Sequence, residues 1–447
     1  MTVATPVYGK LGDLFGRRKM MLVALTIFTV GSILCAMSLS LGMLIGARVI
    51  QGIGAGGLMA LSQAVIGDMV VPRERGRYQG YFSAAYAIAS VAGPILGGVL
   101  TQYVSWRWVF WINLPLGILA IYLAVTRLRM LPVKRRAAAI DYPGIVLMSA
   151  GLTCLLFALT LIEGHSESSH ITLIALLGAA ALCMVLFIRI ERRAKEPLIR
   201  PGIFATPSVT GAIIITFLAN FQIISLSVLV PLRAQLQLGD TAAVAALTLV
   251  PLALGAPMGA YLGGKSAAWL GRYRPQLLGA SIAMPCALLA LAWTPPSTVA
   301  LTFIVTMLVG MAAGVQFPIS LVAVQNAVPA ADMGVASSTV TLARSLGGTI
   351  GVTILSTVML ALLDTRVLPT LSTNGHTNAS INDLFTAMAH AAGPTLDIAR
   401  QAVGSSFHTA ILLSSVVSIV AICAAWWLPD NELRGRSRDE PLTSQVE

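Results

Sequence analysis

The feature that most constrains this chain is its series of long apolar runs. A run of about 20 apolar residues can cross the hydrocarbon core of a bilayer as a helix. The chain of 447 residues is 56% hydrophobic and only 11% charged, which excludes an ordinary soluble enzyme of this length. We therefore predict an all-α, multi-pass membrane protein. The spans are expected at residues 20–38, 41–70, 78–103, 108–126, 143–162, 171–188, 208–230, 241–263, 276–294, 297–323, 333–362 and 406–428.

The distribution of lysine and arginine supports this topology. The net charge of +11 could suggest nucleic-acid binding, but the basic residues recur in small clusters between the apolar runs. If residues 10–19 are cytoplasmic, 23 of the 29 basic residues fall on the cytoplasmic side and four on the opposite side. The remaining two, Arg48 and Arg344, lie inside predicted helices. This asymmetry follows the positive-inside rule, so we expect a lipid bilayer around the chain and no nucleic-acid partner.

A short charged stretch, GKLGDLFGRRK at residues 9–19, precedes the first apolar run. Its glycines allow close backbone approach and its basic residues favour the aqueous face, so it predicts a tight cytoplasmic turn. The same spacing recurs 255 residues later at 264–274, where Ala268 stands at the position of Asp13. This repeat predicts two halves of similar design, as in parallel-repeat transporters.

This stretch resembles the loop signature of the major facilitator superfamily, which follows the second transmembrane helix in that family. The resemblance implies two pseudo-repeated helix bundles and a sequence that starts near the end of helix two. It also implies a charge cluster that latches the cytoplasmic side, and protonation of one member is expected to weaken it. A solvated helix cap is an equal interpretation of Asp68. The matching residues are Gly9, Asp13, Gly16, Arg17, Arg18 and Asp68.

The predicted helix 78–103 resembles the antiporter signature of the superfamily, which is found in exporters. Ala89 replaces one glycine of that pattern. Proline and glycine in a helix predict a bend and close packing, which a generic kinked helix would share. The matching residues are Gly80, Gly93, Pro94, Gly97 and Gly98.

The following segment, WRWVFWINLPLG at 106–117, resembles the 14-helix drug:proton antiporter branch, although its tryptophans also suit a membrane interface. The matching residues are Trp106, Arg107, Asn113, Pro115 and Gly117. Residues 142–190 are similar to the two extra helices of that branch, so about twelve of an expected fourteen helices are predicted here. The expected domains are an incomplete helix bundle (1–130), two linking helices (131–205), a second bundle (206–430) and a polar cytoplasmic tail (431–447).

Two arginines inside predicted helices are candidates for coupling. An arginine at the centre of a membrane helix costs roughly 2.5 to 3.5 kcal/mol, so it usually has a partner inside the protein or a water-filled path. Arg48, with Gln51 one turn later, and Arg344 are therefore candidate functional residues. The alternative is that each arginine only pins helices together or, for Arg344, reaches the cytoplasmic end. Gln222 is a candidate pocket residue.

Together these patterns predict a transporter in the inner (cytoplasmic) membrane that exports drugs or other amphipathic small molecules, driven by the proton gradient. No catalytic motif is found, and we expect no cofactor or metal. Gly52, Gly54 and Gly57 match a dinucleotide fingerprint but lie within one apolar run, which excludes a nicotinamide or flavin site. Two alternatives stay open: a metabolite importer of the same superfamily, and an N-terminally truncated, non-transporting fragment. Substrate identity, the proton-coupling acid, the oligomeric state and a periplasmic adaptor cannot be predicted.

Overall fold

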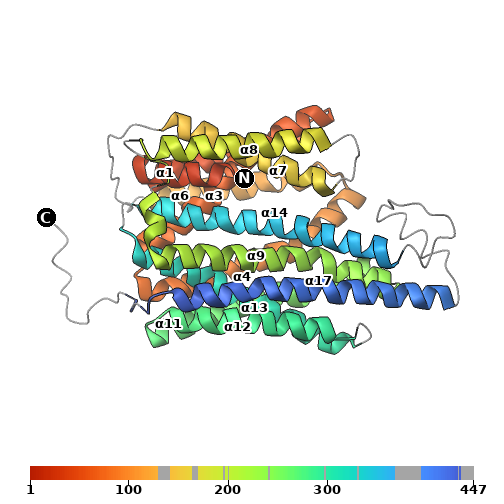
Figure 1. The fold of residues 1–447 in the computed structure, drawn as a ribbon. Coiled ribbons are helices and arrows are strands. Elements are labelled where there is room, and N and C mark those ends of the chain that lie inside the picture. Colours follow the sequence, from red (N-terminus) through yellow and green to blue (C-terminus); the bar gives the residue numbers. More distant parts are fainter. Residues whose placement is uncertain are drawn as a thin grey trace.

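A computed structural model describes residues 1–128, 141–163, 170–194, 197–199, 201–239, 242–295, 298–329, 332–367, 394–430 and 432–433. Nearly all of these residues are helical, and the long helices run roughly parallel to one another (Figure 1). The prediction of an all-α protein is therefore confirmed.

The helices form two halves and a linking hairpin. The N-half (residues 1–128) contains α1 (Ala4–Phe15), α2 (Arg17–Ala36), α3 (Leu41–Met69), α4 (Pro72–Tyr103), α5 (Trp108–Trp111) and α6 (Asn113–Arg127). The linking hairpin consists of α7 (Tyr142–Glu163) and α8 (His170–Glu191), which pack against each other. The C-half (residues 201–433) contains η3 (Pro201–Ala205), α9 (Pro207–Arg233), η4 (Ala234–Leu238), α10 (Ala242–Leu247), α11 (Val250–Leu270), α12 (Arg274–Trp293), α13 (Val299–Ala327), α14 (Met333–Arg366) and α17 (Pro394–Trp427).

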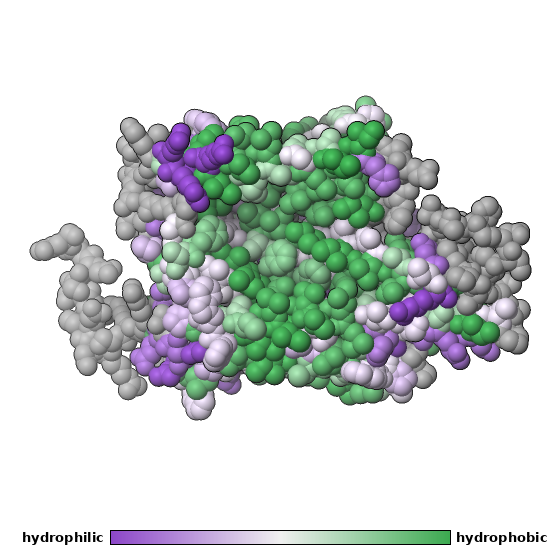
Figure 2. Space-filling model, in the orientation of Figure 1, coloured by the Kyte–Doolittle hydropathy of each residue, from purple (hydrophilic) through white to green (hydrophobic). Residues whose placement is uncertain are grey.

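Eleven of the described helical segments are long and apolar enough to span a membrane, which makes this a multi-pass membrane protein. The predicted number of twelve is not confirmed, because α4 is 32 residues long but less apolar than the other helices. Figure 2 shows the consequence for the surface: a broad hydrophobic belt crosses the middle of the bundle, and hydrophilic residues gather at both of its ends. The helix axes therefore lie across the bilayer.

The structure differs from the predicted spans in four places. Helix α1 was not predicted, because twelve residues with two charges do not form an apolar run of membrane length. The predicted span 108–126 is divided into α5 and α6, and the span 241–263 into α10 and α11. The last helix begins at Pro394, twelve residues before its apolar run, because its first turns contain polar residues such as Asp397, Arg400 and Gln401.

The two halves meet mainly along four pairs of helices. Helix α4 packs along α11 and also contacts α13, while α14 contacts α1 and α3. At the crossing of α4 and α11, a Cβ atom added to Gly76 would lie only 2.9 Å from the Cα of Gly264. Two glycines therefore allow the backbones of the two halves to touch.

Candidate functional site

A single glycine makes the predicted tight turn. Gly16 joins α1 to α2 with φ of 92°, and its amide donates to the carbonyl of Gly12 at 3.1 Å. Positive φ strongly favours glycine. Gly271, 255 residues later in the repeat, joins α11 to the turn before α12 with φ of 68°. The repeated spacing thus places a glycine with positive φ in both halves, although ψ differs, at 138° for Gly16 and 14° for Gly271.

Arg17 gathers two of the predicted latch residues around one guanidinium group. It makes an ion pair with Asp13, one helical turn earlier, and its Nε donates to Asp68 Oδ2 at 2.9 Å. The side chains of Arg17 and Asp13 are each only 7% exposed, while that of Asp68 is 27% exposed. Because Asp68 belongs to α3, the cluster ties α1, α2 and α3 together at this end of the N-half.

Asp13 also reaches across to the C-half. Its two carboxylate oxygens accept hydrogen bonds from the backbone amides of Gly334, at 3.1 Å, and Val335, at 3.0 Å. These amides lie in the first turn of α14, where unpaired N–H groups and the helix dipole favour an anion. Asp13 therefore acts as an N-terminal cap supplied by the other half of the molecule.

Burial raises the pKa of the Asp13 carboxyl to about 6, against the opposing effects of the Arg17 charge and the two amide hydrogen bonds. Asp13 lies in the last turn of α1, next to the Gly16 turn and outside the helical segments that are long enough to span a membrane. Its raised pKa places a titrating group at the contact between the halves.

A second arginine, Arg75 at the start of α4, was not predicted. It donates to the carbonyls of Gly67 at 2.5 Å and Val70 at 2.9 Å, at the end of α3. It also donates to the carbonyl of Gln325 in α13, at 3.3 Å. The Gln325 side chain in turn donates to the carbonyl of Gln63 at 3.2 Å. We call Asp13, Arg17, Asp68, Arg75 and Gln325 the end clamp.

The other two predicted residues of this stretch, Gly9 and Arg18, make different contacts. Gly9 packs against α14, since an added Cβ would lie 2.7 Å from the carbonyl oxygen of Gly334. Arg18 points elsewhere, because it donates to the carbonyl of Val125 at the end of α6, at 3.0 Å. Arg18 therefore stabilises packing within the N-half.

Arg48 and Gln51 belong to a polar network inside the N-half. Arg48 donates to Gln51 Oε1 at 3.1 Å, and its guanidinium lies 4.7 Å from the ring centroid of Phe110. Gln51 donates to the Ser32 hydroxyl at 2.7 Å, which is also 3.5 Å from the Asn113 amide. Gln51 is buried, while Arg48 is exposed. The network joins α2, α3 and α6.

Arg344 lies eleven residues into α14, roughly 17 Å from the start of that helix. It therefore lies well inside the bundle, away from the end at which α14 begins. Its guanidinium is 4.1 Å from the ring centroid of Phe317 in α13 and 5.4 Å from that of Tyr86 in α4. Arg344 thus lies between the halves. The other candidate, Gln222, is fully buried within the C-half, where it donates to the carbonyl of Ser414.

The antiporter-like residues differ in their surroundings. Gly80 lies against α11, where an added Cβ would be 3.5 Å from the Cα of Tyr261. Gly93, Gly97 and Gly98 have no described atom within 4 Å of an added Cβ. Helix α4 continues through Pro94. Only the first of these glycines makes a close contact within the described part of the chain.

The segment around α5 packs α6 onto α2. Arg107 donates to the carbonyl of Ser38 at 3.1 Å, with its guanidinium 4.6 Å from the ring centroid of Trp106. An added Cβ on Gly117 would lie 3.2 Å from the Thr29 methyl group. Pro115 is exposed in the first turn of α6. These residues have a packing role in the N-half.

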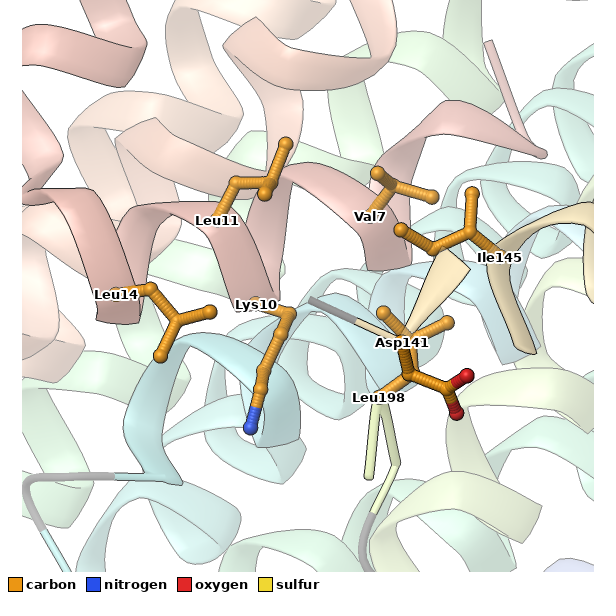
Figure 3. A pocket seen from close by; sticks show the side chains of 7 residues that line it. All are labelled: Val7, Lys10, Leu11, Leu14, Asp141, Ile145 and Leu198. Atoms are coloured by element: carbon orange, nitrogen blue, oxygen red, sulfur yellow. The ribbon is translucent and has the colours of Figure 1, made fainter. Parts of the chain in front are cut away.

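A pocket between α1 and the linking hairpin is mostly apolar (Figure 3). Its lining residues are Val7, Lys10, Leu11 and Leu14 of α1, together with Asp141, Ile145 and Leu198. Lys10 and Asp141 are the only two charged members of this lining. The pocket separates α1 from the start of α7 and holds no cluster suited to chemistry.

The comparisons with known proteins decide the family. Residues 1–352 match the family model described as Major Facilitator Superfamily. The chain belongs to this superfamily. Multidrug resistance protein 3 of Bacillus subtilis is 33% identical to this member over 389 residues, which cover 87% of this chain and 73% of that protein. An uncharacterized MFS-type transporter of Mycobacterium tuberculosis is 32% identical over 370 residues, which cover 82% of this chain and 53% of that protein. The chain therefore spans about half the length of that transporter.

The fold agrees with this family. The crystal structure of the human organic anion transporter MFSD10 (TETRAN) superposes with a TM-score of 0.62 and 16% sequence identity, covering 93% of this chain and 80% of that one. At this level of identity the likeness shows the fold alone. The chain is therefore a multi-pass membrane protein with the fold of a transporter superfamily.

Proposed function

We propose that this protein exports drugs or other amphipathic small molecules across the cytoplasmic membrane, coupled to proton entry, as a member of the 14-helix branch. The sequence similarity to a multidrug resistance protein supports this substrate class. The observation that carries the proposal is the end clamp, in which polar contacts of buried charged groups hold the two halves together at the end of the bundle where Gly16 joins α1 to α2.

Alternating access requires contacts that hold one end of the interface and can be broken. Breaking the end clamp exposes Asp13 and the amides of Gly334 and Val335 to water, which replaces the lost hydrogen bonds. The Gly76–Gly264 contact between α4 and α11 has no side chains to interlock, so the helices can rotate against each other there. In this account, the clamped state closes the cytoplasmic end and leaves the central region accessible from the other side.

The direction of the Asp13 titration limits its role in coupling. A carboxyl with a pKa near 6 in the clamped state and near 3.8 in water binds protons more tightly when clamped. Protonation of Asp13 therefore favours the clamped state. This is the opposite of the sequence-based expectation that protonation of one member weakens the charge cluster. Release of the clamp requires a proton to leave Asp13 or a second group to change its charge.

Transport in proteoliposomes tests the proposal. Vesicles containing the purified protein would be loaded with a fluorescent amphipathic dye, and dye movement would be followed with an imposed pH gradient. We expect dye transport that stops when a protonophore collapses the gradient. Dye transport that is unchanged by the protonophore would contradict proton coupling, and no transport of any compound in a broad panel would contradict the proposed activity.

A further inference from the structure

A cavity between the two halves is lined in part by Arg344. Helices from both halves line this cavity, which is partly open to solvent. Gln63 and Ser83 come from the N-half, while Thr216, Phe317, Thr341 and Arg344 come from the C-half. Both halves therefore supply polar groups to one space.

Arg344 has aromatic rings as neighbours but no acidic partner among the described residues. The acidic residues of the described membrane-spanning helices lie at helix ends: Asp68, Glu163, Glu191, Asp364 and Asp397. Phe317 and Tyr86 stabilise the Arg344 cation through their ring faces. This interaction offsets only part of the cost of removing a guanidinium from water. An anion in the cavity would supply the missing counter-charge.

A second polar group in the same lining also has no partner. Thr216 of α9 is only 1% exposed, and its hydroxyl makes no hydrogen bond within the described part of the chain. A buried hydroxyl normally has a hydrogen-bond partner. Thr216 can donate to an anionic oxygen held by Arg344, whereas an ammonium group offers no acceptor to it.

We propose that this cavity binds the anionic group of an amphipathic aromatic substrate, such as an aromatic carboxylate. This inference rests on the proposed export function and names its substrate class. Arg344 and Thr216 hold the carboxylate, and the rings of Phe317 and Phe82, which also line the cavity, contact the aromatic part. Cations of the same shape are disfavoured because the Arg344 charge repels them.

Three naphthalene probes of similar size but different charge test the charge preference. The affinity of the purified full chain for 2-naphthoate, 2-naphthamide and 2-naphthylmethylammonium would be measured by calorimetry in lipid nanodiscs. We expect the carboxylate to bind at least about tenfold more tightly than the other two. Equal affinities, or a preference for the ammonium probe, would overturn the proposal.

Variants separate anion binding from helix packing. R344Q should lose most carboxylate affinity and keep amide affinity, R344K should retain part of the carboxylate affinity, and T216V should weaken only the carboxylate severalfold. An equal loss for all three probes in R344Q would show that Arg344 only pins α14 to α4 and α13. T216V loses no protein hydrogen bond within the described residues, so it tests the site even if R344Q does not fold.

R366Q is the matched control, because Arg366 lies at the other end of α14 and donates to Ser405 and Thr409. Its probe affinities should equal those of the parent chain. The dye assay in proteoliposomes distinguishes the two proposals. Dye export without carboxylate binding would overturn the charge preference alone, and carboxylate binding without transport of any compound would overturn the export function alone.

Discussion

At the scale of single residues, two neighbouring arginines have different structural roles. Arg17 and Arg18 are adjacent in a basic loop, and sequence alone treats them as equivalent. In the structure, Arg17 pairs with two aspartates, one of which caps a helix of the other half. Arg18 donates to a backbone carbonyl of α6 in its own half. The difference arises because successive residues of a helix point about 100° apart.

Replacing Arg17 should therefore impair export much more than replacing Arg18. R17Q leaves the buried Asp13 carboxylate without its cation, and losing a hydrogen bond between charged groups costs about 1.5 to 3 kcal/mol. We expect the rate of dye export to fall about tenfold or more in R17Q, as 1.4 kcal/mol corresponds to a factor of ten. R18Q, the matched control in the same turn, should change the rate of dye export about twofold or less. Equal losses in both variants would contradict the assigned roles.

The pKa of Asp13 predicts a pH dependence of the clamp. This pKa is about 6 in the clamped state and 3.8 in water. The free energy that favours the clamped state should therefore increase by about 1.4 kcal/mol per pH unit as the pH falls from 6 to 4. The clamp should lose this contribution as the pH rises through 6. Above that pH the carboxyl is ionised in both states and the dependence disappears.

Hydrogen exchange of the first turn of α14 measures this effect, because the amides of Gly334 and Val335 donate to Asp13. After correction for intrinsic exchange rates, their protection should increase as the pH falls from 6 to 4. D13N, which does not titrate, should show no such change. Protection that decreases over this range in the parent chain would contradict the sign of the shift.

At the scale of helices, the apolar runs predicted most of what the structure contains. A span of 20 apolar residues is a local property, so α2, α3, α7 and α9 begin within three residues of their predicted starts. Helix α1 was missed because it is short and charged. Breaks such as the one at Ile112 between α5 and α6 were missed because the apolar run continues through them.

The candidate site was predictable only in part, for a different reason. The sequence stretch around Asp13 and Arg17 has a recognisable spacing, and the structure brings these residues together with Asp68. The role of the α14 amides and of the Gln325 carbonyl could not be predicted, because every residue has such backbone groups. Only the fold determines which of them lie opposite a charged side chain 250 or more residues away.

The contact between α4 and α11 should not tolerate a side chain. In G264L, the added atoms would collide with the backbone at Gly76 and separate the halves. Overpacking of this kind typically costs about 1 to 3 kcal/mol. We expect G264L to unfold at a lower temperature than the parent chain, as measured by scanning fluorimetry. G279L on α12 is the control, since no described atom lies within 4 Å of its added Cβ. Equal unfolding temperatures for the two variants would contradict this close contact.

At the scale of the whole molecule, the hydrogen bonds described between the halves gather at the end of the bundle where Gly16 joins α1 to α2. Helix α4 contributes to these contacts. Its first turn holds Arg75 of the end clamp, and its next turns lie along α11 of the C-half. Because α4 contacts the opposite half so extensively, it moves with any change in the angle between the halves. Opening one end of the bundle should therefore close the other.

Distances between the halves at both ends of the bundle test this claim most directly. Spin labels would be placed at Lys19 and Trp269 near the end clamp, and in a second sample at Leu39 and Val299 at the opposite end, four exposed positions. Distances measured by double electron–electron resonance in the parent chain and in R17Q would then be compared. We predict that R17Q lengthens the Lys19–Trp269 distance and shortens the Leu39–Val299 distance. An unchanged pair of distances, or lengthening at both ends together, would contradict a clamp that controls alternating access.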